Sequence, residues 1–406
     1  MEALVLDVPK RTATVKTLPI PSPSPTQLLV RTHFVALNPV DALYVSHPLA
    51  PKSQTRIVGS DFAGTVQQLG SSIPASARES LKIGTHVAGF LQGACSVNER
   101  PGAFAKFIVV DWDLVWRVPG WMGLESAAGV SLCALTAAQG LFARLGVEAP
   151  FEWDSRNTDN ERGVSEVKDN THGKNGDPLK VFIYGASTSL GQYAAQLVRI
   201  AAHASGREAV LFGAASPARH AMLKVPPYSY NGLVDYREAN WVEKLLEVQN
   251  GEGVQYAFDC ISEGDSVRNV IKTVAPGGKM AVFRSREGKA WAAEPGELPF
   301  EPVYGAVWEG LGVEVQYQGF TVPASASARE FAVNFYGFLS SMTEEDGPLV
   351  LRPNLVRLMP GGLERIVPDG FALLGPGSMD NRDTSRSEAY MRPISAEKLV
   401  YQVLKQ

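Results

Sequence analysis

The chain has 406 residues, of which 45% are hydrophobic and 20% charged, with a formal net charge of −4 at pH 7. This length suits two domains, and the composition is that of an ordinary globular protein. The small negative charge provides no basic surface for nucleic acid or anionic membranes, and no apolar run reaches the roughly 18 residues that span a bilayer.

The first stretch, up to about residue 135, is predicted to be rich in β-strands. Short apolar alternations are bounded by Gly, Pro or Asp, and a proline-rich turn at 19–25 separates the first two of them. The expected strands cover residues 3–8, 28–37, 58–69, 86–90 and 104–110. Many short strands with such turns are typical of a small barrel or sandwich.

The middle stretch changes character. Residues 129–145 have apolar positions at three- and four-residue spacing, which predicts a long helix. Residues 151–178 are polar and contain almost nothing to bury, so we interpret them as a surface insertion. From 179 to about 341, strands alternate with helices, and this pattern predicts a doubly wound parallel sheet.

The last stretch returns to strand-like fragments, at 349–359, 371–375 and 398–404. A segment of this kind can complete the first domain. We therefore expect a β-barrel domain at 1–135 that is completed by 346–406. The α/β dinucleotide-binding domain is expected at 136–345, with the polar insertion at 151–178.

A dinucleotide site is predicted where the buried strand 181–184 runs into a turn of small residues and then a helix. Such a turn lets backbone N–H groups and the helix dipole approach a pyrophosphate closely. An ordinary strand–helix turn is the alternative, because only two of the expected glycines are present. The predicted cofactor residues of this turn are Gly185, Ser187, Thr188, Ser189, Leu190 and Gly191.

The next strand, 209–215, indicates which dinucleotide is bound. It is followed by Ser216 and Arg219, where an NAD enzyme would place an acid for the ribose 2′-hydroxyl. A hydroxyl and a guanidinium suit a 2′-phosphate, so NADPH is favoured; the alternative for Arg219 is a solvated residue at a helix start. Tyr236, after the following strand, is expected near the adenine.

These motifs carry a family resemblance. The chain resembles the medium-chain dehydrogenase/reductase superfamily along nearly its whole length, and within it the fungal trans-acting enoyl reductases and their quinone-oxidoreductase-like relatives. The matching segments are 36–44, 58–64, 135–138, 187–191, 215–219, 275–278, 361–364 and 392–401. The resemblance implies a GroES-like β-barrel domain beside a Rossmann domain.

The resemblance also implies that the zinc of other superfamily members is absent. Zinc-dependent relatives carry Cys at the position of Asn38 and Gly-His-Glu at 59–61, which here is Gly-Ser-Asp. Segment 91–102 contains only Cys95, and Cys133, near the third ligand position, is better interpreted as a small apolar helix residue. Without a Lewis acid, alcohol oxidation is disfavoured, whereas hydride addition to an activated carbon–carbon double bond remains feasible.

The resemblance places two catalytic candidates. Thr136 is expected beside the nicotinamide and substrate, and Tyr44 as a proton donor or oxyanion contact. The alternatives are a helix hydroxyl bonded to a carbonyl and an aromatic ring packed in the barrel wall. Related enoyl reductases often have Trp-Lys where this chain has Ala42-Leu43, which removes a cation near the cofactor.

Further site residues follow from the resemblance alone. The cofactor neighbours are expected to be Asp41, Leu43, Val282, Phe283, Ile394 and Ser395. The substrate is expected to contact Thr136, Gln139, Gly140, Tyr304 and Gly305. The six histidines show no metal spacing, and only His220 is a candidate neighbour of the phosphate.

The expected function is therefore NADPH-dependent reduction of an unsaturated acyl group, in trans to a polyketide or polyketide–peptide synthase. A stand-alone quinone or enone oxidoreductase and a non-catalytic NADPH-binding partner protein are the alternatives. The N-terminus lacks the pattern of a secretory signal, and the three cysteines are widely separated. A cytoplasmic location is expected.

Overall fold

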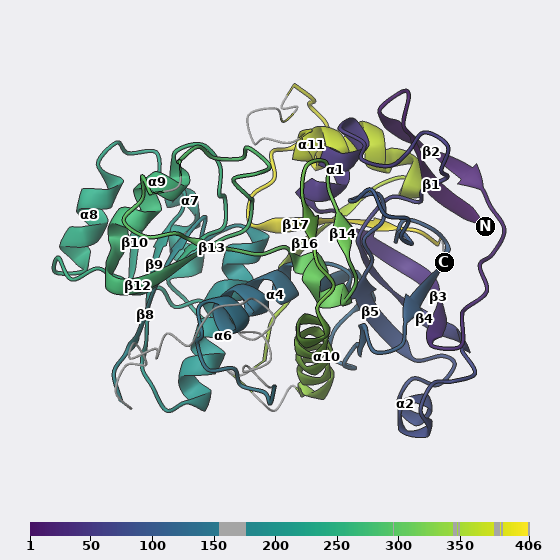
Figure 1. Cartoon of the computed structure of the whole chain (residues 1–406), viewed down its shortest axis with the longest axis horizontal. Coiled ribbons are helices and arrows are strands. Elements are labelled where there is room, and N and C mark those ends of the chain that lie inside the picture. Colours follow the sequence, from purple (N-terminus) through teal and green to yellow (C-terminus); the bar gives the residue numbers. More distant parts are fainter. Residues whose placement is uncertain are drawn as a thin grey trace.

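A computed structural model describes residues 1–153, 176–294, 296–343, 347, 350–376, 382 and 385–404 (Figure 1). Two β-sheets lie side by side, one built mainly from the N-terminal third and the other from the middle of the chain. The helices α4 (Ser131–Ala138) and α10 (Ala326–Ser341) lie between them. In the described part of the chain, no helix is long and apolar enough to cross a membrane.

The first sheet is the β-barrel part of the molecule. Its strand order is β16-β17-β3-β4-β5-β7, and β6 also pairs with β3. The strands are β3 (Gln27–Ala36), β4 (Asp61–Leu69), β5 (His86–Phe90), β6 (Phe107–Asp111), β7 (Val115–Arg117), β16 (Leu355–Met359) and β17 (Glu397–Gln402). A separate hairpin joins β1 (Glu2–Asp7) to β2 (Thr12–Thr17).

The C-terminal strand β17 is an interior strand of this N-terminal sheet. It pairs antiparallel with β3, where Tyr401 lies opposite Val35, and parallel with β16, where Arg357 lies opposite Leu399. Segment 371–375, predicted as strand-like, is instead helical, comprising the end of the π-helix Ile366–Phe371 and α11 (Ala372–Leu374). Periodicity over so short an apolar run cannot distinguish a strand from a buried helix.

The second sheet is entirely parallel, with the order β10-β9-β8-β11-β12-β13. Its strands are β8 (Leu179–Tyr184), β9 (Ala209–Ala214), β10 (Gly232–Val234), β11 (Val254–Asp259), β12 (Val274–Val282) and β13 (Val303–Tyr304). This is the doubly wound order, whose switch point lies between β8 and β11. The predicted fold class, a GroES-like barrel with a Rossmann domain, is confirmed.

Helices cover both faces of the parallel sheet. Val181 and Ile183 point to the face packed by α6 (Ser189–Ala204) and α4, whereas Phe182 points to the opposite face. That opposite face carries α8 (Trp241–Val248) and α9 (Ser266–Val270). Burial on both sides explains why these strands are continuous apolar runs.

The long helix predicted at 129–145 is present in two parts. Helix α4 continues into a π-helix, Gln139–Arg144 (η1), whose wider turn is a form often found at functional sites. The domain boundary predicted between 135 and 136 falls inside α4, so no linker separates the two sheets there.

The first residues of the predicted polar insertion are packed against the core instead of lying on the surface. Phe151 packs against Phe142 and against three phenylalanines of α10, and Trp153 stacks edge-on against Phe331 at 4.8 Å between ring centroids. These first residues are therefore anchored in an aromatic core, because large rings bury too much apolar area to remain in solvent. Residues 154–175 of the insertion lie outside the described part of the chain.

Short elements complete the described chain. They are α1 (Pro39–Ser46), α2 (Ala75–Ser80), α3 (Leu124–Ala127), α7 (Pro217–Leu223), β14 (Val315–Gln316), β15 (Thr321–Val322), and the 3-10 helices at Ile271–Thr273, Val307–Leu311, Gly362–Arg365 and Ala389–Met391.

Candidate active site

The turn after β8 forms a tight cradle at the carboxyl edge of the parallel sheet. The Thr188 hydroxyl donates to Gly185 O at 2.8 Å and accepts from Gly191 N at 3.0 Å, which caps α6. Gly185 has φ +79°, a left-handed conformation that favours glycine, and a Cβ on Gly191 would lie 2.4 Å from Gly185 O. The first N–H groups of a 16-residue helix thus face the sheet edge, a suitable site for an anion.

The other residues of this turn are accessible from the same edge. Ser187, Ser189 and Leu190 are all half-buried, so each retains some exposed surface in this turn. Their assignment to a cofactor stays a prediction. The local geometry fits a pyrophosphate, since the close glycine approach leaves room that a larger residue would fill.

The segment after β9 brings Arg219 against the returning C-terminal segment. Arg219 Nε donates to Ser395 Oγ at 2.8 Å, and Ser216 is the N-cap residue of α7. His220 Nε2 lies 3.0 Å from Ala215 O, so its ring is engaged by the backbone. Two predicted cofactor residues 176 positions apart are therefore in contact.

Tyr236 lies just beyond β10 on the same edge and is 39% exposed. Its ring meets Tyr184 edge-on at 6.2 Å between centroids, and the Arg237 guanidinium lies 5.8 Å from its centre. The ring is therefore held on one side and open on another. Its expected contact with adenine stays a prediction.

The ends of β12 and β13 gather several residues expected near the nicotinamide and substrate. Val282 pairs with Tyr304 in the register of the two strands. The Phe283 ring packs against Phe258, tilted by 38° at 5.3 Å between centroids, and a Cβ on Gly140 would lie 2.8 Å from the Phe283 ring. The structure thus brings together four residues that the sequence analysis placed at the site.

Gly305 and Gln139 take part in a second set of contacts. A Cβ on Gly305 would lie 1.9 Å from Arg144 Nε, and Arg144 pairs with Glu309 at 3.5 Å. Gln139 Nε2 donates to Val307 O at 3.5 Å. Sequence reasoning missed Arg144 and Glu309, because nothing in the helical pattern shows that an arginine there faces inward.

Tyr44 lies where the barrel meets the dinucleotide-binding part. Its half-buried ring packs against the core cluster that includes α4 and α6, and its centroid is 6.3 Å from that of Tyr317. Burial raises the pKa of Tyr44, and burial also raises the pKa of Tyr304 to about 12. These phenols remain protonated at neutral pH and are hydrogen-bond donors; sequence reasoning missed Tyr317.

The Thr136 hydroxyl is already engaged within its helix. Its Oγ1 donates to Leu132 O at 2.7 Å, which is the alternative bond considered from the sequence. The oxygen can still accept a hydrogen bond, since its lone pairs remain. The expected place of Thr136 beside the substrate stays a prediction.

Asp41, in the first turn of α1, is buried rather than facing an open cleft. It is 2% exposed, and its Oδ2 accepts from Asn38 N at 2.8 Å and from Ser60 Oγ at 3.2 Å. Burial raises the pKa of Asp41 to about 7, and the two donors oppose that rise. The observed role of Asp41 is to cap α1, and Leu43 beside it is half-buried.

Ile394, the last of the predicted cofactor neighbours, packs against the barrel core while remaining half-buried. It precedes Ser395, which reaches Arg219. The returning segment therefore lies against the barrel on one side and the dinucleotide-binding sheet on the other.

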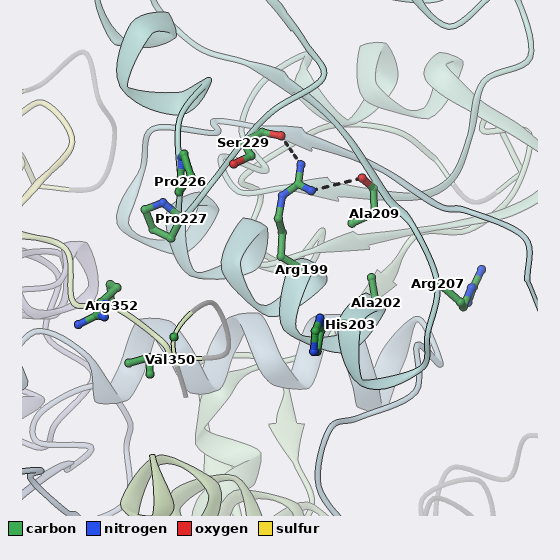
Figure 2. Close-up of a pocket in the computed structure, with 11 residues that line it drawn as sticks. Arg199, Ala202, His203, Arg207, Ala209, Pro226, Pro227, Ser229, Val350 and Arg352 are labelled. Carbon is green, nitrogen blue, oxygen red and sulfur yellow. Dashed lines mark hydrogen bonds between the residues drawn. The ribbon is translucent and has the colours of Figure 1, made fainter. Parts of the chain in front are cut away.

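A cavity of about 640 Å³ lies at the opposite edge of the parallel sheet, by the first residue of β9 (Figure 2). Arg199 donates there to Tyr228 O and Ser229 O, while Arg207 lies apart from it and donates to Asp177 O. These guanidiniums hold loops together through backbone carbonyls. The cavity is far from the strand ends where the candidate site lies.

Comparison with known proteins identifies the family. The family model of the alcohol dehydrogenase GroES-like domain matches residues 24–120, and that of the zinc-binding dehydrogenase matches 190–293. The trans-enoyl reductase thnE of Trichoderma harzianum is 30% identical over 368 residues, covering 90% of each chain. The chain belongs to the medium-chain dehydrogenase/reductase superfamily.

Other similarities agree with this membership. The trans-enoyl reductase traG of Penicillium crustosum is 28% identical over 95% of this chain and 92% of its own. The structure of an alcohol dehydrogenase superfamily protein from Novosphingobium aromaticivorans matches with a TM-score of 0.68 and 20% identity over both whole chains. The CurK enoyl reductase structure matches with a TM-score of 0.64 and 17% identity over 99% of each chain.

A lysine lies among Asn38, Asp61 and Cys133, the residues expected at the positions of the zinc ligands of zinc-dependent relatives. Lys398 Nζ donates to Asn38 Oδ1 at 2.5 Å, lies 3.3 Å from Asp61 Oδ2, and lies 3.4 Å from Cys133 Sγ. Among the described residues, no group of three or more His, Cys, Asp or Glu is placed to hold a metal ion. Cys133, expected as a small apolar helix residue, is buried in the hydrophobic core and also contacts Asn38 and Lys398.

Proposed function

We propose that this protein is an NADPH-dependent, zinc-independent enoyl reductase. It reduces the carbon–carbon double bond of an α,β-unsaturated acyl thioester that a polyketide synthase presents on its carrier. The family membership supports the reaction class, since the fungal relatives that cover nine-tenths of the chain are trans-enoyl reductases. Three free cysteines among the described residues support a reducing, cytoplasmic setting.

The observation that carries the proposal is the position of the Tyr44 ring. It packs against the same core cluster as Tyr304, which ends β13 beside Val282 at the carboxyl edge of the dinucleotide-binding sheet. A protonated phenol at this edge is a suitable donor to an oxygen on which negative charge develops. Such a donor is what reduction of an unsaturated carbonyl requires.

The residues present fit NADPH. The Gly185–Gly191 turn and the amino end of α6 would hold the pyrophosphate, because the close glycine approach leaves space and N–H groups there. No carboxylate occurs from 209 to 220, and the nearest acid after it, Asp235, is paired with Arg237 at 2.9 Å. Arg219 would pair with the 2′-phosphate, since only its Nε is engaged by a described residue. NADPH, when bound, supplies a hydride.

The chain's own residues account for the rest of the reaction. Phe283, which packs against Phe258 and Gly140 and is half-buried, would orient the planar ring of the cofactor against the acyl chain. Tyr44 would donate its hydrogen bond to the carbonyl oxygen as charge develops there, and a neighbouring phenol or water would protonate the α-carbon. Gly305 leaves room for the Arg144 guanidinium, which would help to hold the wall of the acyl pocket in place.

The test is NADPH consumption, followed by its absorbance, against a crotonyl thioester on a pantetheine mimic, a free enone and a quinone. Turnover of the thioester, lost in Ser216→Asp/Arg219→Ala, is the expected result. If NADPH is oxidised only with the quinone or the enone, the protein is a stand-alone, detoxifying oxidoreductase. Binding of NADPH with no acceptor reduced would refute the catalytic proposal and favour a partner protein without catalysis.

A further inference from the structure

Lys398 is a cation held in the interior, where the two parts of the molecule meet. It lies on β17, is 4% exposed, and its stem passes over Gly129, where a Cβ would lie 2.8 Å from Lys398 Cγ. Gly129 therefore leaves room for the side chain to reach inward. An ammonium so deeply buried needs close anionic and polar partners.

The first partner controls the start of α1. Asn38, the N-cap residue of α1, accepts from Lys398 Nζ at 2.5 Å and donates from Nδ2 to Ser60 Oγ at 3.0 Å and Asp61 Oδ2 at 2.9 Å. The backbone N–H of Asn38 is bound by Asp41 within the same helix. Since α1 carries Tyr44, the position of that phenol depends on how Asn38 is held.

The second partner controls the start of α4. Asp61 Oδ1 accepts from Leu132 N at 2.9 Å, and Asp61 Oδ2 lies 3.3 Å from Lys398 Nζ. The carbonyl of the same Leu132 accepts the Thr136 hydroxyl at 2.7 Å. Cys133 is the next residue of α4. Its Sγ lies 3.4 Å from the Lys398 ammonium and donates to Asn38 Oδ1 at 3.5 Å.

We propose that Lys398 is a positioning residue for catalysis: its ammonium fixes the amino ends of α1 and α4 against each other and so aligns Tyr44 with Thr136. This inference rests on the proposed function, because only an enoyl reductase that uses Tyr44 and Thr136 at the substrate needs these two residues aligned. The ammonium itself does not touch the substrate. It acts through Asn38, the N-cap residue of α1, and through Asp61, the first residue of β4, which accepts from Leu132 of α4.

Titratable groups reach this junction from every element packed around it. Asp41 belongs to α1, Asp61 to β4, Cys133 to α4 and Lys398 to β17, while the phenols of Tyr193 and Tyr336 face Asp61 from α6 and α10. Burial raises the pKa of Asp61, and Lys398 opposes that rise. Burial lowers the pKa of Lys398, but Cys133 and Asp61 outweigh it and hold that pKa above its usual range.

The experiment compares four variants. Lys398→Met removes the cation and keeps the length of the side chain, and Lys398→Arg keeps the cation. Lys398→Met/Asp61→Asn removes both members of the ion pair. Arg329→Met is the matched control, since the hydrogen bonds and ion pairs of Arg329 also link the two parts but go to Asp111, Asp113 and Leu311 rather than to α1 or α4.

Steady-state kinetics with the crotonyl pantetheine thioester, together with the NADPH Kd from fluorescence, separates positioning from stability. We expect Lys398→Met to lower kcat roughly 10- to 100-fold while the NADPH Kd changes less than about 3-fold. The double variant should regain the melting temperature but not kcat, and Lys398→Arg should regain part of kcat. If kcat returns together with the melting temperature in the double variant, Lys398 is only structural and the proposal is overturned.

Amide hydrogen exchange tests the same proposal without turnover. We expect faster exchange in 39–46 and 131–138 of Lys398→Met, and of the double variant, than in wild type or Arg329→Met. If wild type reduces no thioester but these segments still loosen, the proposed function fails while the positioning role survives. If neither segment changes, the positioning proposal is wrong whatever the activity.

Discussion

Arg219 Nε and Ser395 Oγ are 2.8 Å apart, one on the helix after β9 and the other on the segment that leads into β17. Both residues were expected at the cofactor, from opposite sides of the cleft. The contact means that a hydroxyl from the C-terminal segment orients a guanidinium suited to a 2′-phosphate. Preorganisation of this kind lowers the ordering cost of binding.

This contact leads to a prediction about cofactor choice. Arg219→Ala should raise the NADPH Kd roughly 10- to 100-fold, because a charge-assisted hydrogen bond contributes about 1.5–3 kcal/mol. The NADH Kd should stay within about 3-fold, since NADH lacks the phosphate. Fluorescence titration with both nucleotides measures this, with Arg207→Ala at the far edge of the sheet as control. An equal loss for both nucleotides would contradict the assignment.

Tyr44→Phe tests the proposed donor. The variant should lower kcat by roughly 100-fold, the effect of losing one donor to a developing oxyanion, without changing the NADPH Kd. Because burial raises the pKa of Tyr44, the wild-type rate should show no loss from its ionisation up to about pH 9. Tyr317→Phe in the same ring cluster is the comparison. A larger loss in that variant would transfer the role to Tyr317.

The raised pKa of Asp41 predicts that the stability of the protein depends on pH. Its pKa of about 7 in the folded protein exceeds the unfolded value of 3.8, so its favourable contribution is complete below the unfolded pKa and is lost as pH rises toward 7. Between pH 5 and pH 8, wild type should lose roughly 3 kcal/mol of unfolding free energy relative to Asp41→Asn. Urea denaturation at both pH values measures the difference.

The control for that experiment is Asp235→Asn. Its hydrogen bond and ion pair with Arg237 lower the pKa of Asp235, so this carboxyl is ionised across the whole range in both states. The variant should keep the wild-type difference between pH 5 and pH 8. A wild-type curve that is parallel to that of Asp41→Asn would show that Asp41 does not titrate with a raised pKa.

Gly305→Ala tests the close approach beside Arg144. The new methyl would displace the guanidinium and should cost roughly 1–3 kcal/mol of stability, together with a higher KM for the thioester. Gly337→Ala is the matched control, because it lies exposed in α10 with no atom near its Cβ position. The Gly337→Ala control should gain up to about 1 kcal/mol of unfolding free energy. Equal melting temperatures for the two variants would contradict the prediction.

Much of the fold was predictable because burial leaves periodic traces in the sequence. The strand–helix alternation from 179 onward and the small-residue turn at 185–191 both reflect local rules and appear where expected. The helix at 366–374 was missed because an apolar run of five residues has no decisive period. Phe151 and Trp153 were missed because their polar neighbours dominate the composition of that segment.

The site was less predictable, because its polar contacts join residues far apart in the chain. Lys398 and Asn38 are 360 positions apart, and no spacing rule links them. Arg144 and Glu309 likewise meet only through tertiary packing. Motif comparison places the residues of one turn or one strand end together, whereas inward-facing charges become visible only when all elements are in place.

The interior position of β17 has a consequence for the order in which the chain can fold during synthesis. Until residues 397–402 leave the ribosome, β3 lacks the partner that it has in the finished sheet, and Asp61 lacks its cation. At a synthesis rate of roughly 5–20 residues per second, β17 is made tens of seconds after β7, and the barrel stays incomplete for that time. The parallel sheet can form first, leaving the incomplete barrel as the segment that needs protection from aggregation.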